Sequence, residues 1–140
     1  MNIRNIKEED YIQYKSLMKS DISEDKYISF LKNILNENHQ IIIIEDNNNL
    51  IATGTIFIEP KMTYGGCLMG HIENIFVNDN YRRKGIGIKV VEKLLKIAKN
   101  KGCYRVDLTC INDLEKFYKK NNLEQRNQIS MSILFEENFN

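Results

Sequence analysis

The chain has 140 residues, enough to bury the core of one domain, and its formal net charge is only +1. This charge gives no electrostatic reason to expect nucleic acid or an anionic membrane as a partner. No apolar run is long enough to cross a bilayer, since Ile41–Ile44 is only four residues. The first residues lack a secretory-signal pattern, and the three cysteines lack metal-ligand spacing. We therefore expect one cytoplasmic domain, residues 1–140, without a metal.

The N-terminal third of the chain has helical patterning behind one short expected strand, Asn2–Ile6. Apolar residues recur at helical spacing between Glu8 and Lys19. Ser23 has the side chain of a helix N-cap, and an apolar stripe follows it as far as Leu35. The sequence therefore predicts two helices before the first long strand.

After residue 40 the pattern changes to β-branched and aromatic segments that are separated by turn residues. Ile41–Ile44 and Leu50–Glu59 are joined by the turn cluster Asp46–Asn49, which predicts a hairpin. A further strand is expected at Cys67–Val77, behind a proline and a pair of glycines. Three consecutive strands are thus expected in the middle of the chain.

The C-terminal half predicts a crossover helix and two more strands. Apolar residues line one face of Gly87–Ala98, and Gly102 stands where a helix C-cap belongs. Tyr104–Thr109 alternates as a strand, Asp113–Lys120 is expected to be helical, and Ile129–Phe135 is expected to be a final strand. The order predicts an α/β (α+β) fold with a mixed, mostly antiparallel central sheet flanked by helices.

One stretch of sequence carries most of the chemical information. The apolar strand end Ile75–Val77 leads through the basic turn Arg82–Lys84 into a helix that begins with Gly85 and Gly87. Backbone N–H groups at a helix N-terminus bind anions, and glycine lets a diphosphate approach the main chain closely. The three cations add positive charge at the same place. The plain alternative is a basic turn that caps an amphipathic helix.

A dinucleotide-binding loop would use the same glycines. That loop has the pattern G-x-G-x-x-G directly after a strand. Here Val90 occupies the third glycine position, and several polar residues separate Val77 from Gly85. The sequence therefore excludes this alternative.

Arg82, Gly85 and Gly87 match Arg/Gln-x-x-Gly-x-Gly/Ala, the signature of the GNAT acetyltransferase superfamily, which the chain resembles. The blocks Gly70–Ile75 and Gly102–Cys110, with Phe117–Lys120 after them, are similar to those of the glucosamine-6-phosphate N-acetyltransferase family. The resemblance extends over about residues 3 to 135. It implies a sheet that is splayed at an acetyl-CoA site.

In the resembled superfamily the glycine loop holds the pyrophosphate of coenzyme A, and the strand before it offers backbone groups to the pantetheine arm. The cosubstrate implied is acetyl-CoA. The residues expected to bind it are Ile75, Phe76, Val77, Arg82, Arg83, Lys84, Gly85, Ile86, Gly87, Ile88, Phe117 and Tyr118.

The resemblance also assigns catalytic positions. Tyr118 is expected to protonate or stabilise the departing thiolate, since a phenol has a reference pKa near 10, above that of a thiol. A half-buried core tyrosine is the alternative. Glu73 is expected to position the amine or accept its proton, and an ordinary outward strand carboxylate is the alternative. Ile72 and Asn74 should point away from Glu73. Asn74, also in the expected catalytic set, replaces the family's aspartate.

Expected contacts with the acceptor come from several segments. The residues are Lys61, His71, Glu73, Thr109 and Arg126. Thr109 stands where the resembled family has an acidic residue. Lys61 or Arg126 would supply charge for a phosphate, and solvated surface cations are the alternative reading of both.

The implied activity is transfer of the acetyl group of acetyl-CoA to the amine of glucosamine 6-phosphate, toward UDP-N-acetylglucosamine. Acetylation of another small amine or amino sugar, or acetyl-CoA binding without turnover, are the alternatives. Enzymes of the resembled family are dimers, and the apolar face of Ile129–Phe135 is an association surface. We therefore expect a homodimer.

Overall fold

The computed structural model describes residues 1–110 and 112–135. The chain divides into two compact units, Met1–Leu108 and Thr109–Asn140, and each is described by itself. The first unit contains the whole sheet and the long helices. The second contains a 3₁₀ turn, Asn112–Leu114, and the short helix α4, Glu115–Lys119.

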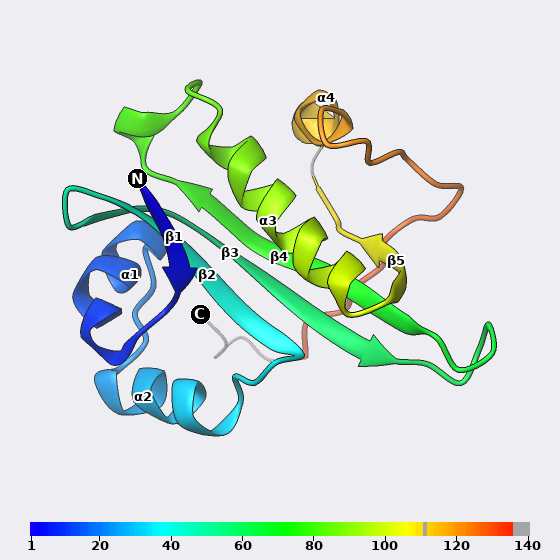
Figure 1. Cartoon of the computed structure of the whole chain (residues 1–140), viewed down its shortest axis with the longest axis horizontal. Helices are drawn as coiled ribbons and strands as arrows, with labels where there is room; N and C mark the ends of the chain where they lie inside the picture. The colour runs from blue at the N-terminus through cyan, green and yellow to red at the C-terminus, as the bar shows by residue number, and fades with distance from the viewer. Residues whose placement is uncertain (111, 136–140) are drawn as a thin grey trace. The chain divides into compact units, whose positions relative to one another are not determined.

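A five-stranded sheet in the order β1-β2-β3-β4-β5 forms the centre of the first unit (Figure 1). The pairs β1/β2, β2/β3 and β3/β4 are antiparallel, and β5 runs parallel to β4. This confirms the predicted mixed, mostly antiparallel sheet. The strands are β1 Asn2–Asn5, β2 His39–Asp46, β3 Asn49–Pro60, β4 Leu68–Val77 and β5 Cys103–Asp107.

Helices cover both faces of this sheet. In β2, Ile41 and Ile43 pack with side chains from the two N-terminal helices, whereas Ile42 and Ile44 turn to the opposite face by strand alternation. All four are buried, which explains the unbroken apolar run. No helix in the described part of the chain is long and apolar enough to span a membrane. The helices are α1 Tyr11–Met18, α2 Glu24–Asn33 and α3 Ile86–Asn100, with 3₁₀ turns at Glu8–Asp10 and Asp79–Tyr81.

The local signals in the sequence act as predicted. Ser23 caps α2, because its Oγ accepts a hydrogen bond from the backbone N–H of Lys26 at 3.2 Å. Asn47 and Asn48 both have positive φ, 50° and 66°, as a tight β2–β3 hairpin requires. Gly102 follows α3 with φ 83°, a conformation that glycine adopts without strain.

The predicted final strand at Ile129–Phe135 is wrong for this structure. Residues 129–135 have no regular secondary structure. A strand needs a neighbouring strand for its backbone hydrogen bonds, and no strand in the described part of the chain pairs with this segment. Ile129, Met131 and Phe135 are accordingly at least 83% exposed.

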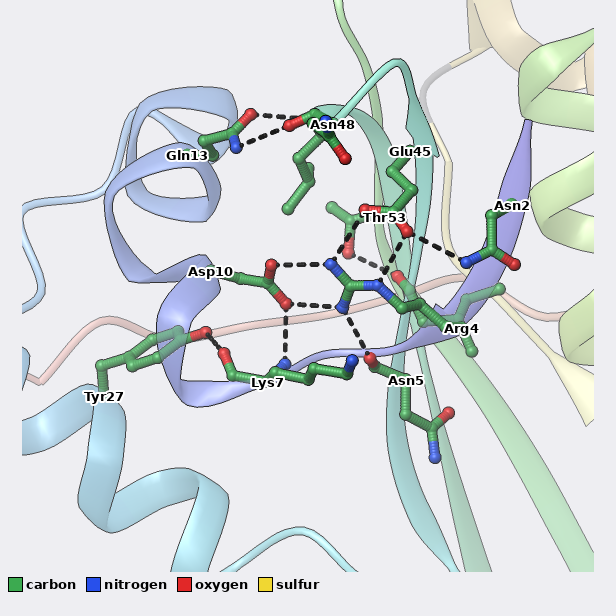
Figure 2. Close-up of polar contacts among 12 residues, drawn as sticks. Asn2, Arg4, Asn5, Lys7, Asp10, Gln13, Tyr27, Glu45, Asn48 and Thr53 are labelled. Carbon is green, nitrogen blue, oxygen red and sulfur yellow. Dashed lines mark hydrogen bonds and ion pairs between the residues drawn. The ribbon is translucent and has the colours of Figure 1, made fainter.

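A buried carboxylate ties the first strand to the rest of the unit (Figure 2). Asp10 is 5% exposed, and its two oxygens accept hydrogen bonds from Arg4 Nη1 at 2.8 Å and Nη2 at 2.9 Å. The backbone N–H of Lys7 also donates to Asp10 at 2.7 Å, and Arg4 Nη2 reaches Glu45 Oε2 at 3.2 Å. Burial alone would raise the pKa of Asp10, but the hydrogen bonds from Arg4 and Lys7 outweigh it, and the pKa is lowered.

Arg4→Met should reduce the free energy of unfolding by about 2 to 3 kcal/mol, because it leaves a buried carboxylate without its cation. The lowered pKa means that the ionised carboxylate of Asp10 stabilises the fold above its unfolded pKa, roughly 4. That contribution is lost as the pH falls through the lower folded value. The difference between mutant and wild type in urea unfolding should therefore shrink at acid pH.

Lys32→Met provides the matched control for this prediction. The pair Lys32–Glu8 is 3.8 Å long, and its side chains are 65% and 53% exposed. Its loss should cost less than about 0.5 kcal/mol. Equal effects of the two substitutions at neutral pH would contradict a stabilising role for the Arg4–Asp10 pair.

Candidate functional site

The basic turn between β4 and α3 presents three exposed cations. Arg82 Nε lies 3.2 Å from Asp79 Oδ1, and Lys84 Nζ lies 5.4 Å from the centre of the Tyr81 ring. Arg83 has a φ of 62°, which turns the chain sharply just before the helix. All three cations are solvent-exposed. The turn therefore offers positive charge to a ligand.

The N-terminus of α3 begins at this turn without a side-chain cap. Gly85 is the N-cap residue, with a φ of 76°, and no side chain hydrogen-bonds there. A Cβ at Gly85 would have no heavy atom within 4 Å, so glycine is required by the backbone conformation and not by crowding. A helix N-terminus carries partial positive charge in its first turn. The predicted phosphate-binding loop thus has the form an anion site needs.

Half of β4 lacks a neighbour on one edge. β5 pairs with Leu68–His71 only, and within the described residues no strand continues the pairing along this edge to Val77 (Figure 1). Backbone N–H and C=O groups there are able to bond a ligand, as one extended chain bonds another. Ile75, Phe76 and Val77, the predicted pantetheine contacts, lie in this half of the strand. The predicted splay of the sheet is present.

A β-bulge interrupts β4 directly after Glu73. Thr55 pairs with Glu73 and Thr53 with Phe76, so two residues on β4, Asn74 and Ile75, oppose one on β3. Asn74 has a φ of 56°. An ideal Cβ at Gly54 would lie 2.7 Å from Ile75 Cδ1, in a space that also contains side chains of α3.

The bulge corrects one prediction about side-chain directions. Asn74 does not share the buried face of the sheet with Ile72. Ile75 takes that place, and Glu73 and Asn74 are both exposed in succession. Simple alternation fails because the extra residue resets the period of two. Two polar side chains are therefore presented at the start of the unpaired half of β4.

Beside Glu73 on β4, His71 belongs to a row of rings across the sheet. His71 stacks on Phe57 of β3 with ring centres 6.1 Å apart, and Phe57 contacts His39 of β2 at 5.3 Å. His71 Nε2 lies 3.0 Å from Glu59 Oε1, and Lys61 Nζ lies 3.2 Å from the same oxygen. The hydrogen bond from His71, then that from Lys61, lowers the pKa of Glu59. The structure thus brings together two predicted acceptor residues, His71 and Lys61.

Glu59, which joins them, is absent from the predicted site. A signal for it exists in the sequence: Phe57, Glu59 and Lys61 alternate toward a hairpin turn, and the returning strand carries His71. Alternation places Phe57, Glu59 and Lys61 on one face, and the register of the returning strand decides whether His71 joins them. Arg105 and Asp107 of β5 were missed too, and they form an ion pair of 2.9 Å beside this row, with Asp107 in register with His71.

Ile86, Gly87 and Ile88 form the first turn of α3, and the other predicted residues belong to the second unit. Tyr118 lies on α4, and its ring contacts that of Phe117 at 4.9 Å. Burial raises the pKa of Tyr118, with a smaller contribution from Cys110. The phenol therefore keeps its proton through neutral pH, as an acid must. Thr109 and Arg126 are exposed.

A cleft of about 380 Å³ lies on the first unit. It opens between the first strand and α2, and its lining includes Lys7, Leu31 and His39. None of the predicted site residues lines it. Within the described residues, no group of three or more His, Cys, Asp or Glu side chains is arranged to hold a metal ion.

Comparisons with known proteins agree with this geometry. The model of the family described as acetyltransferase (GNAT) family matches residues 2–122. A crystal structure of glucosamine-6-phosphate N-acetyltransferase from Arabidopsis thaliana superposes with a TM-score of 0.91 at 29% sequence identity. The superposition covers 96% of this chain and 98% of that one.

Two curated relatives are more similar in sequence over shorter segments. The probable glucosamine 6-phosphate N-acetyltransferase 2 of Oryza sativa subsp. japonica is 36% identical over 105 residues, 72% of this chain and 63% of the relative. Glucosamine 6-phosphate N-acetyltransferase 1 of Dictyostelium discoideum is 41% identical over 86 residues, 61% of this chain and 54% of the relative. The chain thus spans 54% to 63% of the length of these relatives.

Proposed function

Because the chain belongs to the acetyltransferase (GNAT) family, we propose that it moves the acetyl group of acetyl-CoA to the amine of glucosamine 6-phosphate. The observation that carries the proposal is the turn before α3, where exposed cations, a left-handed Gly85 and an uncapped helix N-terminus form an anion site. The acceptor is inferred from relatives that bear this activity in their names.

The proposed cosubstrate site runs from the turn onto β4. Arg82, Arg83 and Lys84 would neutralise the pyrophosphate, and the N–H groups at the start of α3 would bond it. The unpaired half of β4 would bond the pantetheine arm. The residues assigned to acetyl-CoA are Ile75, Phe76, Val77, Arg82, Arg83, Lys84, Gly85, Ile86, Gly87, Ile88, Phe117 and Tyr118.

The proposed chemistry is direct attack of a neutral amine on the thioester carbonyl. Glu73 is exposed at the start of the unpaired half of β4, so it is available to hold the amine. Asn74 beside it offers a neutral amide in place of a second carboxylate. As the C–S bond breaks, Tyr118 would give its proton to sulfur, and the raised pKa of this phenol keeps the proton in place beforehand.

Acceptor recognition is assigned to four polar residues. Lys61 and Arg126 would supply charge for the sugar phosphate, and His71 and Thr109 would line the sugar site. Lys61 is already engaged with Glu59 at 3.2 Å, so phosphate binding by Lys61 would compete with that ion pair.

Release of free thiol with a panel of amines tests the proposal. We expect turnover with glucosamine 6-phosphate to exceed that with glucosamine and with simple alkylamines. If only another amine were turned over, glucosamine 6-phosphate would be wrong as the acceptor, but the chain would still be an acetyltransferase. Binding of acetyl-CoA without turnover of any amine would favour the non-catalytic alternative.

We further propose that the whole chain acts as one cytoplasmic domain and assembles as a homodimer. A large apolar surface is exposed to water near the C-terminus. It consists of Ile129, Met131, Ile133 and Phe135, whose exposed fractions are 73% to 85%. A second copy of the chain would cover it and supply the backbone partners that a strand needs.

Light scattering at micromolar concentration should give about twice the 16.5 kDa of one chain. Met131→Asp should shift the mass toward that of one chain, because it places a charge in the proposed interface. Glu124→Lys, an exposed charge change outside the apolar segment, is the control. A mass of one chain for the active wild type would contradict the dimer.

A further inference from the structure

We propose that His71 is the general base that removes the proton from the acceptor amine, with Glu59 as the positioning residue that fixes its ring. This inference rests on the proposed acetyl transfer and goes beyond it, since the substrate ammonium must lose a proton before it can attack.

The hydrogen bond between His71 and Glu59 fixes the tautomer. A carboxylate has no proton to donate, so the ring nitrogen 3.0 Å from Glu59 Oε1 must carry the hydrogen and donate it. Neutral His71 therefore has its proton on Nε2 and a lone pair on Nδ1. In the described part of the chain, no side chain hydrogen-bonds Nδ1. A carboxylate that holds one imidazole nitrogen while the other takes a proton is an established arrangement in catalysis.

A ring contact adds to this hydrogen bond in holding the orientation of the imidazole. Phe57 stacks against His71 with the two planes 25° apart, so the imidazole lies over a neighbouring ring. The side chain of His71 is nevertheless 32% exposed, and a substrate can reach it. A fixed yet accessible imidazole is what proton abstraction requires.

The position of His71 relative to Glu73 suits an amine between them. The two residues are two apart on one face of β4, before the bulge, and such residues lie roughly 7 Å apart. An ammonium seated between them would contact the Glu73 carboxylate on one side and Nδ1 on the other. The first holds the cation and the second takes its proton.

Several charged groups surround this imidazole. Lys61 contacts Glu59 Oε1 as well and partly neutralises the negative charge of this carboxylate. Asp107 of β5 pairs in register with His71 and is itself neutralised by Arg105 at 2.9 Å. Glu73 is the nearest carboxylate on the same strand. The carboxylates Glu59, Glu73 and Asp107 and the cations Lys61 and Arg105 are thus the charged groups around His71.

The proton balance of the step is complete. Nδ1 takes one proton from R–NH₃⁺, and the lone pair of the neutral nitrogen forms the C–N bond with the thioester carbon. The electron pair of the breaking C–S bond leaves on sulfur, which takes a proton. The nitrogen loses its second proton as the amide forms. The net reaction yields amide and thiol and releases one proton to solvent.

Nitrogen NMR of labelled histidine tests the arrangement without turnover. The chain has only two histidines, so the signals that remain in His39→Gln are those of His71. We expect neutral His71 to carry its proton on Nε2, and Glu59→Gln to weaken that preference. A neutral ring with its proton on Nδ1 would overturn the proposal.

The pH profile of kcat/KM tests the role. His71→Gln keeps a donor for Glu59 but has no basic nitrogen, so kcat/KM should fall on the order of 10²- to 10⁴-fold at neutral pH. Its acid limb should move to higher pH, where the free amine loses its own proton. Glu59→Gln removes the acceptor that fixes the ring of His71 but keeps the basic nitrogen, so kcat/KM should fall by less than about tenfold.

His39→Gln is the matched control, because the ring of His39 also contacts Phe57, and no carboxylate in the described part of the chain pairs with it. Its profile should equal that of the wild type. An unchanged acid limb in His71→Gln would contradict the role of His71 as the general base. A loss confined to KM for the phosphate-bearing acceptor would contradict it too. Neither result would contradict the proposed acetyl transfer. If the wild type turned over none of the amines, both the proposed acetyl transfer and the general-base role of His71 would be contradicted.

Discussion

Gly85→Glu should abolish the rise in Tm that acetyl-CoA gives to the wild type. A ligand that binds only the folded state at 100 times its Kd stabilises it by about 2.7 kcal/mol. For a domain of this size that corresponds to roughly 10 °C. The substitution introduces a carboxylate where the pyrophosphate is proposed to lie, at the positive end of α3. Differential scanning fluorimetry with and without acetyl-CoA measures the shift.

Backbone strain must be separated from the loss of binding in this test. Gly85 has a φ of 76°, so any side chain there costs stability by itself. Gly65 has nearly the same φ, 74°, and open space around its Cβ, but it lies in the β3–β4 turn. Gly65→Glu should therefore lose a similar amount of intrinsic stability and keep the acetyl-CoA shift. Equal shifts in the two variants would contradict the proposed phosphate site.

Tyr118→Phe should lower kcat by about tenfold to a thousandfold while the KM for acetyl-CoA changes little. The hydroxyl is proposed to act on negative charge that develops on sulfur only as the C–S bond breaks. Losses in this range are usual when a general acid is removed. Because burial raises the pKa of Tyr118, the phenol stays protonated and the loss should be uniform across neutral pH. Steady-state thiol release over a pH series gives both constants.

The same deletion of a hydroxyl elsewhere provides the control. Tyr64 is 68% exposed and stacks on Tyr104 at the β3–β4 turn, so Tyr64→Phe should leave kcat within twofold of the wild type. Turnover of Tyr118→Phe equal to that of Tyr64→Phe at every pH would exclude Tyr118 from the chemistry.

Local sequence signals predicted the fold of the first unit well, because each acts over a few residues. Ser23 caps a helix, the asparagines after Asp46 close a hairpin, and Gly102 ends α3. The bulge at Asn74 could not be read in the same way. It depends on the partner strand, where Gly54 offers no side chain against Ile75 and α3.

The predicted final strand is a second case in which a local pattern was not sufficient. Ile129–Phe135 has the alternation of a strand, yet alternation describes only which side chains would share a face. Whether the segment has hydrogen-bonding partners depends on the position of other strands. In the described chain no strand pairs with it. The pair Glu59–His71 likewise required the register of two strands, which a linear pattern of residues does not give.

The central claim is that this chain forms an amide on glucosamine 6-phosphate at the expense of acetyl-CoA. Mass spectrometry and NMR of the reaction product test it most directly. We expect a product heavier by one acetyl group, with the new bond on the amino nitrogen, the phosphate intact and one free thiol released per amide. Acetyl-CoA consumed only by hydrolysis, with glucosamine 6-phosphate recovered unchanged, would contradict the account.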